Sequence, residues 1–123
     1  MIDITDRLVG WAQEITAFKG QVYRFYPQKK MAGKTFAIIT PTGHSPRVME
    51  DGEEVIADLT WNVEIYGQTP TTVDSILQDL TALYGKYNIT LQGITHGYNP
   101  DIRQYLTQVS YSAVVDKRGC VFR

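Results

Sequence analysis

The segment that most constrains the fold is an alternating run that follows an Asp51-Gly52 pair. Between residues 55 and 65 every second side chain is apolar, and the side chains between them are largely polar. A period of two is the pattern of a β-strand with one face against a core. Asp-Gly is a favoured pair for the type I′ turn of a β-hairpin. The sequence therefore predicts a hairpin in which Arg47–Glu50 pairs with Glu53–Tyr66, and whose buried face is made by Ala57, Leu59, Trp61, Val63 and Ile65.

Two amphipathic helices are predicted, one before and one after this hairpin. Apolar side chains recur at helical spacing over Ile4–Phe18, with Asp3 as the cap and Gly20 as the end. The second helix is predicted over Pro70–Tyr87, with Thr69 as its cap and proline at its first position. Each helix has one apolar face, so both are expected to pack against the sheet.

The remaining β-prone stretches complete an α+β fold. Hairpin-linked strands with two helices imply one domain over residues 1–123, with a mostly antiparallel sheet and both helices on one face. The expected order is α-β-β-β-α-β-β, with room for an extra strand at each end. These stretches are Gln21–Tyr26, Thr35–Thr40 (bounded by Pro41, Gly43 and Pro46), Thr90–His96 and Ile102–Val115, and a turn at Asp116–Gly119 precedes the C-terminal stub.

Strand length indicates that part of the sheet projects. Glu53–Tyr66 and Ile102–Val115 are fourteen residues each, which is roughly 46 Å when extended. A domain of this size has a diameter of roughly 35 Å. Such strands must bend, carry bulges or extend beyond the body. The hairpin Arg47–Ile56 is therefore predicted to be a projecting, solvated arm, and its interface residues are predicted to be Val48, Met49, Glu50, Asp51, Gly52, Glu53, Glu54 and Val55.

Composition and charge argue against several classes of function. Twelve basic and thirteen acidic side chains give a net charge of −1, whereas proteins that hold nucleic acid by charge are clearly basic. The single cysteine, Cys120, rules out an internal disulfide and a cysteine-based zinc site. The first residues lack the pattern of a signal peptide, and no apolar run reaches the ~20 residues of a membrane span. A soluble protein of a reducing cytoplasm is expected, with no cofactor and no membrane partner.

Motifs with catalytic or metal-binding chemistry are incomplete. Gly33-Lys34-Thr35 resembles the end of a P-loop, but Gln28 stands where that motif needs its first glycine, and a strand follows. His44 and His96 lie in separate segments and are interpreted as surface histidines. Cys120 has no motif around it and is expected to be a small buried apolar residue. No catalytic, cofactor-binding or metal-binding residue is predicted, and the chain is not expected to be an enzyme.

One basic and aromatic cluster leaves a nucleic-acid-binding alternative open. Stacked bases and phosphates could use such a set of side chains. A solvated loop is the interpretation we favour. The cluster consists of Lys29, Lys30 and Lys34 beside Tyr23, Phe25 and Tyr26.

The order of elements resembles the tail terminator (tail completion, or tail-to-head joining) proteins of long-tailed bacteriophages. The resemblance covers nearly the whole chain and includes the opening helix, the Asp51-Gly52 hairpin and the single long second helix. Its most familiar part is the closing stretch, in which a tyrosine, an apolar pair and an aspartate precede a turn glycine. The segments that carry it are Phe36–Ile39, Val63–Gly67, Tyr111–Asp116 and Gly119–Phe122.

This resemblance implies a structural virion protein. The family forms hexameric rings that cap the tail tube, end its growth and join the tail to the head. The implied partners are copies of the chain itself, the tail tube protein and a head-completion or neck protein, while genomic DNA passes through the lumen without specific binding. The implied location is the head-proximal end of the tail, assembled in the bacterial cytoplasm. The alternatives are another neck, tail-tube or baseplate subunit, a nucleic-acid-binding module using the Lys29–Lys34 loop, and a small α+β enzyme.

Overall fold

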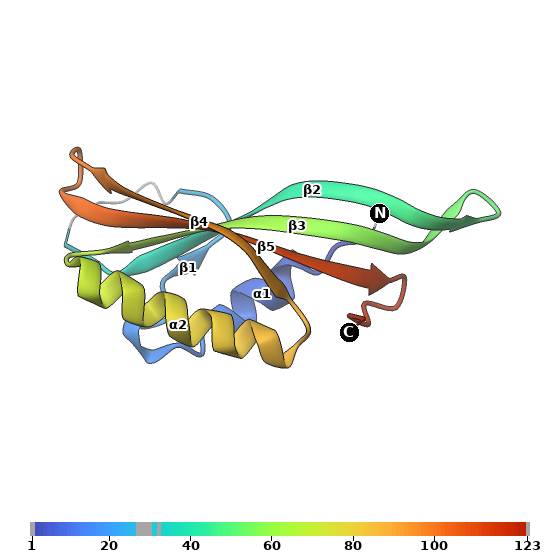
Figure 1. The fold of residues 1–123 in the computed structure, drawn as a ribbon, viewed down its shortest axis with the longest axis horizontal. Coiled ribbons are helices and arrows are strands. Elements are labelled where there is room, and N and C mark those ends of the chain that lie inside the picture. The colour runs from blue at the N-terminus through green and yellow to red at the C-terminus, as the bar shows by residue number, and fades with distance from the viewer. Residues whose placement is uncertain (1, 27–30, 32, 123) are drawn as a thin grey trace.

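Five strands form a single sheet in the order β1-β2-β3-β5-β4 (Figure 1). The computed structural model describes residues 2–26, 31 and 33–122. Strand β1 pairs with β2 in parallel, and every other neighbouring pair is antiparallel. The elements are α1 (Thr5–Ala12), the 3-10 helix η1 (Thr16–Phe18), β1 (Val22–Tyr23), β2 (Phe36–Glu50), β3 (Glu53–Gly67), α2 (Pro70–Lys86), β4 (Thr90–Asn99) and β5 (Gln104–Asp116).

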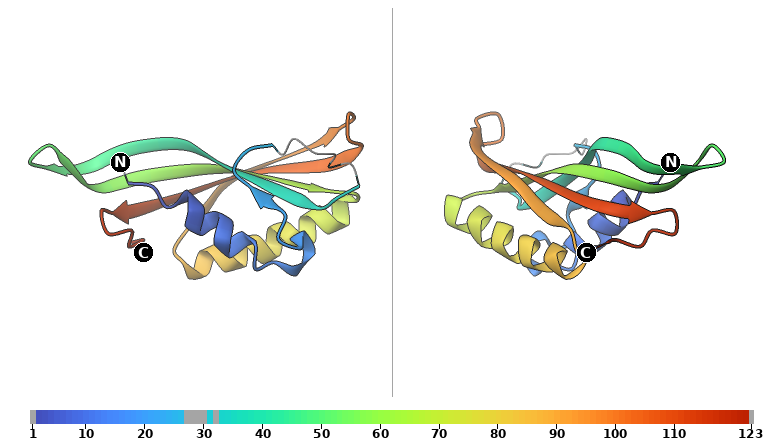
Figure 2. Two further views of the ribbon diagram at one scale, coloured as in Figure 1. Left: turned by 180° about the vertical axis from the view of Figure 1, so that it is seen from behind. Right: turned by 45° about the vertical axis from the view of Figure 1, so that its right-hand side comes forward.

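Both α-helices cover the same face of the sheet (Figures 1 and 2). This confirms the predicted α+β class, the mostly antiparallel sheet and the one-sided helical layer. The long second helix begins as predicted, because the hydroxyl oxygen of Thr69 accepts a hydrogen bond from the N–H of Thr72 at 3.2 Å. Asn88, which follows the end of α2, has a positive φ of 64°, a conformation that asparagine tolerates better than most residues.

The main core lies between the helices and the central strand β3. The predicted register of β3 is confirmed, because all five side chains of the predicted apolar face are buried. Leu8 from α1 and Leu80 and Tyr84 from α2 belong to the same buried cluster. Trp61, at the middle of β3, is 1% exposed. Burial of these large side chains is the main stabilising contribution to the fold.

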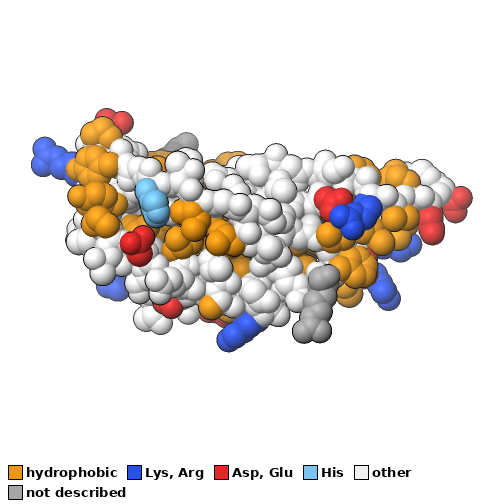
Figure 3. All heavy atoms as spheres, in the orientation of Figure 1, with side chains coloured by type: hydrophobic (Ala, Val, Ile, Leu, Met, Phe, Trp, Pro, Cys, Tyr) orange, Lys and Arg blue, Asp and Glu red, His pale blue; other side chains and the backbone are white. Residues whose placement is uncertain are grey.

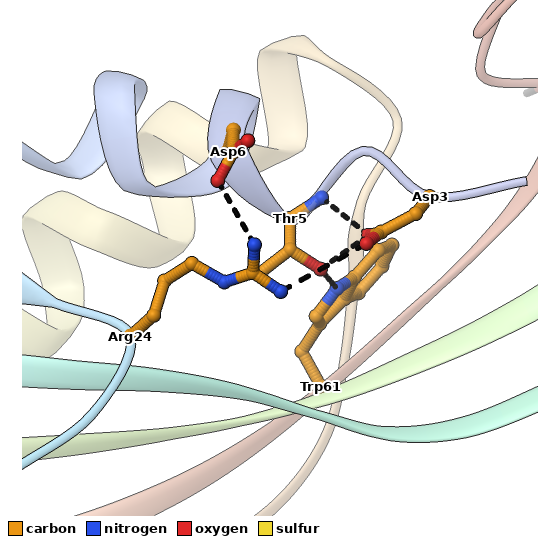
Figure 4. A network of polar contacts seen from close by, with 5 residues as sticks. All are labelled: Asp3, Thr5, Asp6, Arg24 and Trp61. Carbon is orange, nitrogen blue, oxygen red and sulfur yellow. Dashed lines mark hydrogen bonds and ion pairs between the residues drawn. The ribbon is translucent and has the colours of Figure 1, made fainter.

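A polar network joins Trp61 to the start of α1 (Figure 4). The indole N–H donates to the hydroxyl of Thr5 at 3.0 Å, and Thr5 in turn donates its hydroxyl and its N–H to Asp3. Arg24 lies 3.8 Å from Asp3 and 3.2 Å from Asp6. The hydrogen bond from Thr5 lowers the pKa of the Asp3 carboxyl, although partial desolvation opposes it. Asp3 therefore braces the start of α1 through Thr5, but the prediction that it is the N-cap is wrong, because the N-cap residue is Ile4.

A second hydrophobic cluster lies on the opposite face of the sheet and was not predicted. Because side chains alternate across a strand, Phe36 and Ile38 point away from the helices and meet Tyr66 and Met31. The rings of Phe36 and Tyr66 are stacked with centroids 4.4 Å apart. Desolvation raises the pKa of the Tyr66 hydroxyl, and its hydrogen bond to Glu64 adds to this. Tyr66 follows Glu64 on the face of β3 that is largely polar in the sequence, and its ring anchors this second cluster.

Two boundaries predicted around the hairpin and the first helix are wrong. Strand β2 does not end at Pro41 but continues to Glu50, with register shifts that absorb the irregular residues. Strand β1 pairs with β2 only at Ala37 and Ile38, so β2 lies at the edge of the sheet beyond Ile38. Prolines are tolerated on an edge strand, because their missing N–H can face solvent. Helix α1 ends at Ala12, and the apolar stripe continues through η1, since the β-branched Ile15 and Thr16 are poor helix formers.

Candidate functional site

The β2–β3 hairpin is the part of the molecule that extends furthest from the core (Figures 1 and 2). The pairing of β3 with β5 ends at Ile56 opposite Asp116. Beyond that point β2 and β3 continue as a two-stranded ribbon to the pair Glu50–Glu53. Asp51 and Gly52 have φ values of 52° and 75°, as a type I′ turn requires at both central positions. The predicted projecting hairpin is therefore present, and it begins where the third strand stops.

The base of the hairpin is anchored by side chains. Glu54 accepts a hydrogen bond from the N–H of Ile2 at 3.0 Å and contacts the ring of His44 at 2.6 Å. Arg47 donates two hydrogen bonds to Asp58, at 3.0 and 2.6 Å. Partial desolvation raises the pKa of the Glu54 carboxyl, but the Ile2 N–H and His44 outweigh it, so the pKa lies below its ordinary value. The hairpin is predicted to be solvated, but Glu54 within it and the neighbouring Asp58 brace the arm instead.

The tip of the hairpin, residues 48–53, is exposed. Val48 and Met49 are 37% and 53% exposed. Within the described residues, the carboxylates of Glu50, Asp51 and Glu53 form no ion pair. Figure 3 shows acidic side chains gathered at this end of the molecule. Of the predicted interface, the tip is thus available to a partner, while Glu54 and Val55 are half-buried at its base.

A basic and aromatic groove, which sequence reasoning missed, lies between α1, the end of α2 and the turn after β5. Its volume is about 330 Å³. The rings of Trp11 and Tyr87 stack in its wall with centroids 3.8 Å apart and an interplanar angle of 6°. Three cations line it, namely Arg7, Lys86 and Arg118. These residues are far apart in the sequence, so only the tertiary structure brings them together.

The turn after β5 shapes one wall of this groove and corrects the prediction for Cys120. The carboxylate of Asp116 accepts hydrogen bonds from the N–H groups of Arg118 and Cys120, both at 2.9 Å. Arg7 reaches across from α1 and donates to the carbonyl of Gly119 at 2.6 Å. This tight turn holds Cys120 at the surface, where it is exposed and lines the groove. The expectation that Cys120 is buried is therefore wrong.

A second exposed surface lies at the opposite end of the sheet. Tyr98 and Tyr105, on the adjacent strands β4 and β5, pack edge to face with centroids 5.1 Å apart. Their exposed fractions are 51% and 39%. They border a hollow of about 410 Å³ that Val73 and His96 also line. Figure 3 shows hydrophobic side chains gathered at this end of the molecule. The richness in tyrosine was the only sequence signal for such a surface.

The motifs set aside in the sequence have ordinary structural surroundings. The carbonyl of Gly33 accepts a hydrogen bond from Gln68 at 2.9 Å, and strand β2 rather than a helix follows at Phe36. His96 contacts the hydroxyl of Thr107 at 3.0 Å. Among the described residues, no three potential metal ligands come together. Lys29 and Lys30 lie outside the described residues, and Lys34 is exposed.

No helix in the described part of the chain is long and apolar enough to cross a membrane. Comparison with known proteins finds no matching family model and no matching curated protein.

Proposed function

We propose that this chain is a structural subunit that assembles with copies of itself into a ring, as a tail terminator of a long-tailed bacteriophage does. The observation that supports this most is the hairpin tip, an exposed two-stranded ribbon anchored at its base and free at its end. Val48 and Met49 are exposed on the projecting arm, so they do not contribute to the chain's own core. Exposed apolar side chains that are grouped together often mark a protein–protein contact. Arms of this kind are suited to grip a neighbouring subunit.

In this proposal the ring caps the tail tube, ends its growth and receives the head. Its partners are the tail tube protein and a head-completion or neck protein, and genomic DNA passes through the lumen without specific contacts. The chain acts at the head-proximal end of the virion tail and has no catalytic step of its own. Another neck, tail-tube or baseplate subunit is the nearest alternative, because it would use the same kind of projecting arm.

The experiment that tests ring assembly is a measurement of molar mass in solution and on tail tubes. Six copies of the 13.9 kDa chain have a mass of about 83 kDa. We expect hexamers by light scattering at tens of micromolar, or monomers that become hexameric rings when tail tubes are added. Negative-stain images should show closed rings. A stable twofold dimer that ignores tail tubes would contradict the proposal, and a monomer that shifts DNA in a salt-sensitive manner would favour the nucleic-acid alternative.

A further inference from the structure

We infer that the acidic hairpin tip of one copy docks into the basic, aromatic groove of the next copy. This inference rests on the proposed ring and names the two surfaces that would meet in it. The tip is the segment of residues 48–53, and the groove is the hollow lined by Arg7, Trp11, Lys86, Tyr87 and Arg118. Both surfaces belong to the chain itself, so the occupant of the groove is a second copy of the protein.

The groove has the chemistry to receive carboxylates. Arg7 donates to a backbone carbonyl, and within the described residues neither it nor Lys86 forms an ion pair. Arg118 lies 3.5 Å from Asp116, but its side chain is 80% exposed. The Asp116 carboxylate is already engaged by two N–H groups of the turn. The cations of the groove therefore exceed the acids, and their donors face solvent.

The tip has the complementary chemistry. It presents three carboxylates that form no ion pair with any other described residue, next to two exposed apolar side chains. The groove likewise places cations next to the stacked rings of Trp11 and Tyr87. Matched charges fix the register of an interface, while apolar contacts supply most of its affinity. Each feature of the tip thus has a counterpart in the groove.

The docking must occur between copies and not within one chain. The hairpin base is held by Glu54 and by the ladder between β3 and β5, so the tip points away from the body. Figure 1 shows the tip at one extremity of the molecule, beyond the C-terminal turn and the helices. The tip cannot therefore bend back to its own groove. Two different patches that meet between copies form a head-to-tail contact, which closes into a ring when the rotation allows it.

A second copy fits the groove better than nucleic acid does. The protein carries a net charge of −1, which repels the phosphates of a nucleic acid. The three cations of the groove are few to overcome this repulsion. The acidic tip would also repel a nucleic acid brought near it in a ring. The ability of the groove to bind an oligonucleotide is therefore a competing outcome of the test.

Cys120 allows the docking to be tested directly, because it is the only cysteine and lies exposed in the groove. The variant Met49→Cys adds a second thiol at the tip and keeps all three carboxylates. A short bismaleimide should then join the tip of one copy to Cys120 of the next, in at least tenfold higher yield than in the wild type. A matched control is Ser75→Cys, which places a thiol on the exposed face of α2. A second control, Met49→Cys combined with Cys120→Ser, should not cross-link.

The pattern of cross-linked species separates this inference from the proposed function. A ladder that reaches six chains on a denaturing gel supports both the docking and the ring. Cross-linked dimers alone support the docking and contradict the ring. Rings of the expected mass, with no more cross-linking in Met49→Cys than in Ser75→Cys, overturn the docking while the proposed function stands.

Charge reversal provides an independent test on the same surfaces. The variant Glu50→Lys/Glu53→Lys and the variant Lys86→Glu/Arg118→Glu should each weaken assembly by about tenfold or more. In a mixture of the two variants, every contact between unlike variants pairs opposite charges, so rings in which the variants alternate should form. The quadruple variant pairs opposite charges at every contact. Recovery of assembly in the quadruple variant supports the docking. Normal assembly of either double variant, or loss of oligonucleotide binding by Lys86→Glu/Arg118→Glu without loss of assembly, overturns it.

Discussion

The two strands of the hairpin are equal in length but differ in their surroundings. Strands β2 and β3 each have fifteen residues and pair from the body to the tip. Strand β3 lies between β2 and β5 from Ile56 to Tyr66. Its side chains alternate between the helix-covered core and the other face. Strand β2 is buried only over Phe36–Ile39, and nearly all of its remaining residues are exposed.

This difference separates the part of the sheet that maintains the fold from the part available for partners. Truncation of the apolar side chains of β3 should lower the free energy of unfolding, because these side chains fill the main core. The outer half of β2 contributes few buried contacts, so changes there should affect stability little. The predictions below test this division, in order of decreasing effect on the free energy of unfolding.

The largest effect is expected for Trp61→Ala in β3. The variant leaves a cavity beside α1 and removes the hydrogen bond to Thr5, so it should lose about 3–5 kcal/mol of stability. In a domain of this size that loss lowers the melting temperature by roughly 10–20 °C. Urea and thermal denaturation measure it. The control Met49→Ala removes an exposed apolar side chain from the outer half of β2 and should stay within about 0.5 kcal/mol. Equal losses in both variants would contradict the division.

A smaller, pH-dependent effect is expected for Glu54→Gln at the base of the hairpin. The pKa of Glu54 is lowered from its ordinary value of 4.5, so its charged form is favoured in the folded state. Its contribution is fully present above that value and is lost as the pH falls through the lower folded pKa. The variant should therefore melt below the wild type at pH 7, and the difference should shrink at pH 3.

The matched control for this pH dependence is Glu50→Gln, which removes an exposed carboxylate at the tip. Because Glu50 forms no ion pair within the described residues, its variant should melt as the wild type does at both pH values. If the difference in melting temperature between Glu54→Gln and the wild type grows on acidification, the predicted direction of the pH dependence is wrong.

The smallest effect on stability is expected when the hairpin is shortened. In this variant Asn-Gly replaces Glu50–Glu53 and connects Met49 to Glu54 by a favoured two-residue turn. Met49 and Glu54 already face each other in the ladder. The acids of the tip are lost, while the anchor at Glu54 is kept. We expect a melting temperature within a few degrees of the wild type. If the chain acts as proposed, oligomers should be lost and tails should be over-long or headless. Unchanged assembly would show that the tip has no role in assembly. Loss of the folded state would show that the tip is needed for the stability of the core.

The fold was largely predictable because its signals are local. The alternation through Trp61 set the register of β3, and the cap Thr69 and the pair Asp51-Gly52 marked α2 and the turn. The strand β2 was divided incorrectly at Pro41 because the sequence does not say which strand lies at an edge. Only the short length of β1 shows that this proline needs no hydrogen-bond partner.

The candidate site was predictable only in part. The tip follows from strand length and from the turn pair, both of which can be seen in one short segment. The groove cannot be found in this manner, because Arg7, Lys86 and Arg118 come from three distant segments. The roles of Glu54 and Asp58 were also hidden. Their partners His44 and Arg47 are set by the pairing of β2 with β3, and Ile2 is 52 residues away from Glu54 in the sequence.

The irregular outer edge of β2 has a consequence for the behaviour of the free chain. An exposed edge strand can recruit other strands and seed fibrils, and prolines and bulges are common protections against this. The edge of β2 carries Pro41 and Pro46 and three register shifts. These features disfavour edge-to-edge pairing of the free chain into filaments. We expect the purified chain to remain clear and free of thioflavin-binding aggregates at concentrations at which a regular, proline-free edge would form fibrils.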